Sequence, residues 1–243
     1  MALFVSKENH CLSELLWKWK AGELVADIPL VISNHDDNRT EVESYGIPFF
    51  HIPSTKNNRK EAEEEALTLL SEHRIELVVL ARYMQILTPN FVSAYPYKII
   101  NIHHSFLPAF IGANPYAKAF ERGVKLIGAT AHYVTDDLDE GPIIEQDIMR
   151  VNHRHTASDL RIAGRNIERI ALARAVSWHL NDQLLVHGNK TIVFFRKSLS
   201  VCLSFLMLVD HFFRHPTVNY NRFTINECML RICEKQTHSC NVF

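Results

Sequence analysis

The chain lacks the features that mark membrane, secreted and nucleic-acid-binding proteins. Its longest later apolar run, Leu199 to Val209, stops at Asp210, short of the roughly 20 apolar residues that cross a bilayer. Five cysteines form neither CxxC pairs nor a disulfide framework. Lysine and arginine (26) are balanced by aspartate and glutamate (27), so a net charge of -1 gives no sign of binding to nucleic acid or to a membrane surface. We therefore expect a soluble, cytoplasmic protein of a reducing compartment.

The amino terminus lacks the pattern of a signal peptide. The apolar start gives way at once to Lys7 and Glu8, whereas a signal peptide has a basic start and a longer apolar region. Ala2–Val5 is therefore predicted to be a first strand. With 243 residues, 47% of them hydrophobic, the chain can form one good-sized domain or two small ones around a substantial core.

Short apolar strands alternate with helical patterns as far as residue 194. The predicted strands are Ala2–Val5, Ile28–Ser33, Pro48–Ile52, Ile75–Ala81, Lys98–Ile100, Ile127–Val134 and Ile143–Val151. The longest predicted helices run from about Arg59 to His73 and from Thr156 to about Asn181. This alternation predicts an α/β fold, a doubly wound and mostly parallel sheet with flanking helices. Leu184 to Phe194 should close it with a β-hairpin around Gly188-Asn189.

Local signals predict where several helices begin and which side chains they bury. Thr88-Pro89 is an N-cap followed by a first-turn proline, and Thr156 with Asp159 resembles a capping box. In the long last helix we expect an inward face made of Leu160, Ile167, Ile170, Leu172, Val176 and Leu180. The acid cluster Glu61, Glu63, Glu64 and Glu65 is interpreted as a solvated helix face rather than a metal site.

The character of the sequence changes after Phe195. Residues 196–243 hold four of the five cysteines, no glycine and no clear period. The spacing of Cys228, Cys233 and Cys240 lacks the close pairs usual in structural zinc sites. We predict a catalytic domain of residues 1–195 and an atypical appendage of residues 196–243, poorly ordered or helical in part, with no role in the chemistry.

Polar residues with catalytic potential gather between Ile100 and Gly141. Asn101 and His103 lie at or just past the end of a buried strand, where open α/β sheets place their chemistry. The strand Ile127–Val134 runs into the acidic turn Thr135–Gly141. Phe106 to Gly128, which carries Pro108, Gly112 and Pro115, favours an irregular loop of ligand size. An amide donor, an imidazole and a carboxylate at neighbouring strand ends suit acyl-type chemistry.

Two segments here resemble the formyltransferase family, which handles 10-formyltetrahydrofolate. They are Asn101-Ile-His-His-Ser-Phe-Leu-Pro108 and His132-Tyr-Val-Thr-Asp-Asp-Leu-Asp-Glu-Gly-Pro142. The segments Ser6–Leu12 and Ala81–Leu87 and the doubled His103-His104 are similar to the formyltetrahydrofolate deformylase branch. The resemblance extends from about Ala2 to Phe194 and rests on several separated segments in the same order and spacing.

The resemblance implies a catalytic trio of Asn101, His103 and Asp139. Attack on a formyl carbon builds an oxyanion, which the Asn101 amide and a protonated His103 can stabilise. Asp139 can hold the imidazole in its charged form and accept the proton of the attacking water. The expected reaction is hydrolysis of 10-formyltetrahydrofolate to formate and tetrahydrofolate, with formate supplied to purine biosynthesis.

The resemblance also implies a site for the pterin end of the folate, between Arg82–Leu87 and Thr135–Gly141. Apolar side chains suit a flat ring, and backbone groups at strand ends can read its edges. The implied folate-binding residues are Arg82, Met84, Gln85, Ile86, Leu87, Thr135, Asp136, Leu138 and Gly141. No metal and no cofactor besides the folate substrate are expected.

Alternatives remain for the acceptor of the formyl group. Relatives that transfer it to glycinamide ribonucleotide carry a glycine-rich turn after the first strand, whereas this chain has Ser6-Lys-Glu-Asn-His10, a poor cradle for phosphate. His10 and Asn9 either line the vacated acceptor pocket or simply start a helix. Transfer to tRNA would call for a basic carboxyl-terminal module, and the tail is not basic enough. A catalytically silent formyl-folate binder is the remaining alternative.

Other histidines receive lesser roles. His104 is ranked behind the trio because neighbouring residues on a strand point to opposite sides. His132 is interpreted as packed against the sheet rather than catalytic, and a zinc hydrolase built on His103, His132 and Asp139 is the rival mechanism that we reject. Deformylases usually carry an amino-terminal ligand-sensing domain of the ACT type, and this chain begins at the first strand. We expect a catalytic module without that feedback control, and the sequence leaves a homo-oligomer open.

Overall fold

The structure is a computed structural model that describes residues 1–55, 57–108 and 115–195. Residues Met1–Ile192 form one compact unit, and a second unit begins at Val193. The predicted appendage of residues 196–243 lies outside the described residues, as does the middle of the predicted loop with Gly112.

In the described part of the chain, nine strands form one sheet in the order β3-β2-β1-β4-β5-β6-β7-β9-β8. The strands are β1 Ala2–Val5, β2 Leu30–Ser33, β3 Phe49–His51, β4 Val78–Leu80, β5 Ile99–His103, β6 Leu126–Tyr133, β7 Ile143–Arg150, β8 Leu184–His187 and β9 Lys190–Val193. Strands β1 to β5 are parallel, and β6 and β7 continue the sheet in antiparallel pairs. The α/β prediction, with a mostly parallel sheet and a closing hairpin, is confirmed.

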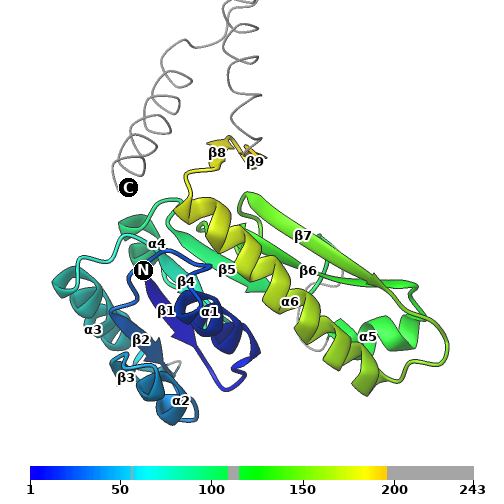
Figure 1. The fold of residues 1–243 in the computed structure, drawn as a ribbon, viewed down its shortest axis with the longest axis horizontal. Coiled ribbons are helices and arrows are strands. Elements are labelled where there is room, and N and C mark those ends of the chain that lie inside the picture. The colour runs from blue at the N-terminus through cyan, green and yellow to red at the C-terminus, as the bar shows by residue number, and fades with distance from the viewer. Residues whose placement is uncertain (56, 109–114, 196–243) are drawn as a thin grey trace, which may run out of the picture. The chain divides into compact units, whose positions relative to one another are not determined.

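Helices cover both faces of this sheet (Figure 1). They are α1 His10–Lys20, α2 Arg39–Ser44, α3 Arg59–Glu72, α4 Pro89–Ala94, α5 Pro115–Arg122 and α6 Ala157–Leu180. One core packs α1, α2, α5 and α6 against alternate residues of the strands, Leu3, Val79 and Ile100 among them. The other core packs α3 and α4 against the intervening residues, which include Phe4 and Ile99. A strand buried on both faces reads as a continuous apolar run, which is why the sequence predicted these strands.

Two predicted helix starts are confirmed. Thr88 accepts a hydrogen bond from the backbone N–H of Phe91, and Thr156 and Asp159 form a capping box. The prediction that the acid cluster is solvated was wrong for Glu63, which is buried and accepts hydrogen bonds from the backbone N–H and the hydroxyl of Thr88. The predicted inward face of α6 was also wrong for Ile170, whose side chain is 45% exposed.

Strand β5 runs three residues past the predicted end at Ile100 and ends at His103. Asn101 and His103 therefore belong to the strand itself and, two residues apart, share one face of it. Strand β6 is antiparallel to β5, and Asn101 is paired with His132 in the ladder. The register of β6 against β7 shifts between Ala131 and His132, an irregularity that sits next to the polar cluster.

Candidate active site

Strand alternation places Asn101 and His103 on one side of β5, and the turn after β6 brings Asp139 to them. The Nδ1 atom of His103 lies 3.2 Å from Oδ1 of Asp139. Asp139 has a positive φ of 59°, which is uncommon for a residue with a side chain and clusters at functional sites. The amide, imidazole and carboxylate that the sequence analysis grouped therefore lie together.

The His103–Asp139 pair is largely shielded from water. The hydrogen bond from His103 lowers the pKa of Asp139 below its ordinary value, so the carboxylate stays charged at neutral pH. Since Asp139 accepts a hydrogen bond from Nδ1 of His103, the other ring nitrogen is available to interact with a substrate. That atom, Nε2, is buried and has no hydrogen-bond partner among the described residues. A buried ring nitrogen of this kind is suited to exchange a proton with a bound substrate.

His132, interpreted from the sequence as packed against the sheet, is buried and also lies beside Asn101 and Asp139. Its Nδ1 lies 2.9 Å from the carbonyl oxygen of Tyr133 and must donate to it, because a carbonyl only accepts. Burial lowers the pKa of His132 and favours the neutral ring, which leaves a lone pair on Nε2. The amide nitrogen of Asn101 lies 3.3 Å from Nε2 and donates to it. His132 therefore orients the Asn101 amide. One N–H of that amide donates to His132, and the second N–H remains available to a ligand.

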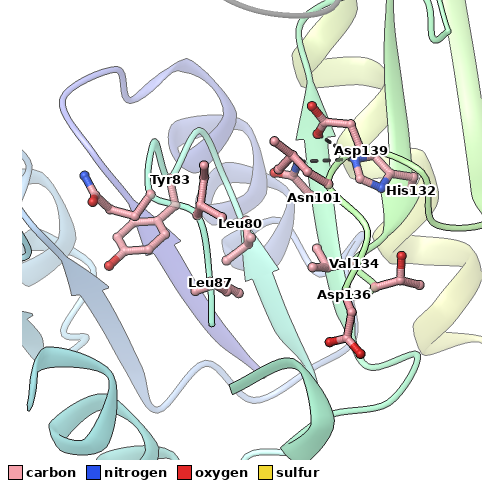
Figure 2. A pocket seen from close by; sticks show the side chains of 12 residues that line it. Leu80, Tyr83, Leu87, Asn101, His132, Val134, Asp136 and Asp139 are labelled. Atoms are coloured by element: carbon pink, nitrogen blue, oxygen red, sulfur yellow. Dashed lines mark hydrogen bonds and ion pairs between the residues drawn. The ribbon is translucent and has the colours of Figure 1, made fainter. Parts of the chain in front are cut away.

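The same ring faces Asp139. Nε2 of His132 lies 3.7 Å from Oδ1 of Asp139, so both histidines approach one carboxylate oxygen. Figure 2 shows Asn101, His132 and Asp139 converging at one end of a pocket. The prediction that His132 packs into the sheet is right about its burial, but its polar edge belongs to the site. His132 is paired with Asn101 across the β5–β6 ladder. This pairing depends on how the two strands align, so it could not be taken from the sequence of either strand alone.

A pocket that is partly open to solvent lies next to these residues. Tyr83, Leu80 and Leu87 lie across it from Asn101 and Asp139 (Figure 2). Of the residues predicted to bind folate, six line this pocket: Gln85, Ile86, Leu87, Thr135, Asp136 and Leu138. The other lining residues are Leu80, Tyr83, Asn101, His132, Val134 and Asp139. A pocket with apolar walls and a few convergent polar groups suits a flat heteroaromatic ring.

Three predicted folate-binding residues do not line the pocket. The Arg82 side chain is instead paired with Glu8 and Glu168. Met84 has a side chain 58% exposed, and its backbone N–H donates to the Ser6 hydroxyl at 2.9 Å. A Cβ on Gly141 would lie 1.8 Å from the carbonyl oxygen of Tyr133, so glycine is required there for close backbone approach. Gly141 thereby supports the turn that carries Asp139.

His104 lies directly behind the pair. Its ring centroid is 5.2 Å from that of His103, with the planes tilted by 33°. Burial, together with the charge of Arg82, lowers the pKa of His104 to about 4. His104 is therefore neutral at physiological pH and adds no charge beside His103.

One group of side chains has the donor types of a metal site. His10, Cys11 and Glu168 offer ligand atoms within 4.8 Å of one another. However, both Glu168 oxygens already accept hydrogen bonds, from His10 and Tyr116, and Arg82 faces the same carboxylate. Burial raises the pKa of the Cys11 thiol well above its ordinary value, which opposes the thiolate that a metal needs. These residues do not fit a metal ion.

No helix in the described ranges is both long and apolar enough to cross a membrane.

Comparison with known proteins gives one consistent result. The family model described as formyl transferase matches residues 1–176. The chain is 64% identical over 194 residues to the formyltetrahydrofolate deformylase of Bacillus subtilis, covering 80% of this chain and 65% of that relative. It is 50% identical over 193 residues to the deformylase of Escherichia coli strain K12, covering 79% and 69%. This chain thus spans about two thirds of the length of these relatives.

Solved structures agree with the sequence relatives. A formyltetrahydrofolate deformylase from Pseudomonas syringae superposes with a TM-score of 0.78 at 52% identity, covering 80% of this chain and 65% of that one. A phosphoribosylglycinamide formyltransferase from Anaplasma phagocytophilum gives a TM-score of 0.74 at 33% identity, covering 82% and 94%. Both kinds of enzyme share the fold, and the deformylases are the more similar in sequence.

Proposed function

Since this chain belongs to the formyl transferase family, we propose that it hydrolyses 10-formyltetrahydrofolate to formate and tetrahydrofolate. The observation that carries the proposal is the His103–Asp139 pair, with the oriented amide of Asn101, at the end of a pocket with apolar walls and a few polar groups. The identity to formyltetrahydrofolate deformylases, 64% and 50%, supports water as the acceptor over the amine used by relatives at 33% identity.

In this mechanism three groups act on the formyl carbon. Water adds to it and gives its first proton to Asp139, while the N–H of Asn101 that His132 leaves unused stabilises the oxyanion together with the imidazolium of His103. Asp139 stabilises positive charge on the ring and orients it. The C–N10 bond then breaks with its electron pair on N10, which takes up a proton from His103 or a water molecule. The second proton of the attacking water leaves when formic acid ionises.

The pocket supports binding of the pterin end of the folate. Ile86, Leu87 and Leu138 supply apolar contacts for the ring, and Gln85, Thr135 and Asp136 supply polar ones. Arg82 is removed from our predicted contacts, because its side chain is committed to other partners.

The proposal also covers where in the cell the reaction takes place and which part of the chain carries it out. We place the reaction in the cytoplasm, where it would balance folate one-carbon pools and supply formate for purine biosynthesis. We assign the chemistry to residues 1–195 and none of it to residues 196–243.

The test measures formate release from 10-formyltetrahydrofolate by the purified chain, with and without glycinamide ribonucleotide. Formate in the absence of the ribonucleotide is expected. Strict dependence on the ribonucleotide, with formylated product, would identify a transformylase instead. Binding of the folate without either product would identify a silent binder and refute the proposal.

A metal-dependent version of the reaction is tested separately. His103, His132 and Asp139 lie close enough together to make zinc hydrolysis a rival mechanism. In the proposed mechanism the rate is unchanged after dialysis against a chelator and addition of zinc. Activity that is lost with chelator and restored by zinc would favour the rival.

A further inference from the structure

A second cluster of polar side chains lies beside the catalytic residues, centred on Glu168 of α6. Glu168 is 1% exposed. Its Oε2 atom lies 2.8 Å from Nε2 of His10 and 3.4 Å from Nε of Arg82. Its Oε1 atom accepts a hydrogen bond of 2.6 Å from the Tyr116 hydroxyl. Both carboxylate oxygens are therefore occupied by side chains from three other segments of the chain.

Glu8 extends this cluster toward solvent. Its Oε2 atom accepts from Nη2 and Nε of Arg82, at 2.8 and 3.1 Å, and its Oε1 atom accepts from Arg165 at 3.0 Å. Two carboxylates thus face two guanidinium groups, and the charges balance. We call Glu8, His10, Arg82, Tyr116, Arg165 and Glu168 the Glu168 cluster.

The Glu168 cluster reaches the neighbourhood of His103 through Arg82 and His104. Leu80, the last residue of β4, is paired with Asn101 of β5, and Arg82 follows Leu80 by two residues. The charge of Arg82 helps to lower the pKa of His104, the chain neighbour of His103. Arg82 has a positive φ of 64°. Its side chain is nine-tenths buried, and its Nη1 atom has no hydrogen-bond partner in the described residues. A buried cationic donor thus lies near the reacting end of the site.

The cluster and the folate pocket lie on opposite faces of the sheet. The pocket residues Leu80 and Val134 belong to the core packed by α3 and α4. The cluster is built on α1, α5 and α6, which pack the other face. His104 lies between, with its ring centroid 5.2 Å from that of His103 and 6.3 Å from that of Tyr116. A nucleophile approaching the formyl carbon from the face away from the folate would meet this cluster.

Packing around Tyr116 shows that the space there is filled. Gly164 precedes Glu168 by four residues, about one turn of α6. A Cβ on Gly164 would lie 2.1 Å from the Tyr116 ring. The absence of a side chain at Gly164 therefore lets the ring lie against the helix, so that its hydroxyl reaches Glu168.

We propose that the Glu168 cluster determines the acceptor, by filling the space opposite the folate so that water reaches the formyl carbon and a substituted amine does not. This inference rests on the proposed hydrolysis and specifies how its acceptor is selected. An amine that carries a larger group would have to displace Arg82 or Glu8 and leave a buried charge unpaired, which is strongly unfavourable. Water needs no such rearrangement.

Opening the cluster should let an amine compete with water. The lone pair of an unprotonated amine adds to the formyl carbon, the C–N10 bond breaks, and N10 receives a proton that the attacking amine loses. The products are a formamide and tetrahydrofolate instead of formate and tetrahydrofolate. The ratio of formamide to formate therefore reports the choice of acceptor, independently of the total rate.

The experiment uses glycinamide as the probe amine and measures N-formylglycinamide and formate by mass spectrometry. The wild type is expected to give formate, with formamide at the level of the reaction without enzyme. Glu8→Ala and the double variant Glu8→Ala, Arg82→Gly are expected to raise the ratio of formamide to formate at least tenfold. Glycine suits the positive φ at Arg82. Glu8→Ala alone keeps Arg82 paired with Glu168, so it provides a folded variant if the double variant unfolds.

The matched control is Arg174→Ala. It also removes two ion pairs of α6, with Glu145 at 3.0 Å and Asp147 at 2.7 Å, but outside the Glu168 cluster. Its ratio should stay at the wild-type value. An unchanged ratio in folded Glu8→Ala, or efficient formylation of glycinamide by the wild type, would overturn the inference while leaving the hydrolysis intact. Absence of formate from the wild type without amine would instead overturn the proposed function, and the inference with it.

Discussion

The amide nitrogen of Asn101 lies 3.3 Å from Nε2 of His132, its partner across the β5–β6 ladder. The hydrogen bond from His132 to the Tyr133 carbonyl leaves Nε2 as an acceptor, so the amide has one orientation. An oxyanion donor is effective when it is held in place before the reaction begins. In the proposed mechanism His132 thus positions the amide of Asn101 and touches no reacting atom itself.

The first prediction tests this role of His132. His132→Phe keeps the ring volume but removes the acceptor, and we expect kcat to fall about 10- to 100-fold, equivalent to about 1–3 kcal/mol. KM should change little because the amide acts mainly in the transition state. His132→Gln, which can still accept from Asn101, should recover part of the loss. Equal rates for the Phe variant and the wild type would contradict the positioning role.

The second prediction concerns Asp139. Asp139→Asn removes the charge that stabilises the imidazolium of His103, and we expect kcat to fall by about 10³-fold. Asparagine tolerates a positive φ, so the thermal unfolding temperature should stay close to that of the wild type. Asp137→Asn, in the same turn, is the control and should retain full turnover. A folded Asp139→Asn enzyme with wild-type turnover would remove Asp139 from the mechanism.

A third prediction concerns the turn that carries Asp139. The Cβ of Gly141→Ala would collide with the Tyr133 carbonyl, which is backbone and cannot rotate away. We expect a loss of about 1–3 kcal/mol in the free energy of unfolding, measured in urea, together with a lower kcat. Glu140→Ala changes the neighbouring exposed side chain and should alter neither. If Gly141→Ala has wild-type stability and kcat, the close approach does not constrain the turn.

The fourth prediction concerns pH and stability through His104. The unfolded chain protonates this ring near its ordinary pKa of 6.5, whereas burial in the folded chain lowers the pKa to about 4. Between these values the unfolded state binds more protons, so stability should decrease as the pH falls from 6.5 to 4. The contribution is at most about 3 kcal/mol. The hydrogen bond from His103 lowers the pKa of Asp139, so its contribution is lost only below the ordinary value of 3.8.

The measurement is the free energy of unfolding in urea as a function of pH. His104→Gln should flatten the decrease between pH 6.5 and 4 relative to the wild type. His153→Gln, which alters an exposed histidine, should leave the wild-type slope unchanged. A slope in His104→Gln that matches the wild type would show that another group causes the decrease.

Much of the fold was predictable because the relevant signals are local. Apolar runs flanked by turns located the parallel strands, and the residues Thr88 and Thr156 located two helix starts, since an N-cap depends on neighbours three residues away. The hairpin β8–β9 likewise followed from the turn at Gly188. The prediction for Glu63 failed because its partner Thr88 is 25 residues away and comes from another helix.

The sequence by itself determined the strand-helix alternation, the polar residues at the strand ends and the grouping of Asn101, His103 and Asp139. Only the tertiary structure decided that His132 lies beside Asn101 and Asp139, that Arg82 does not line the pocket, and that Gly141 supports the turn of Asp139. The physical reason is that these roles depend on the register between strands, on a positive φ at Arg82 and on the approach of backbone at Gly141. Each of these is set by contacts between segments distant in the chain.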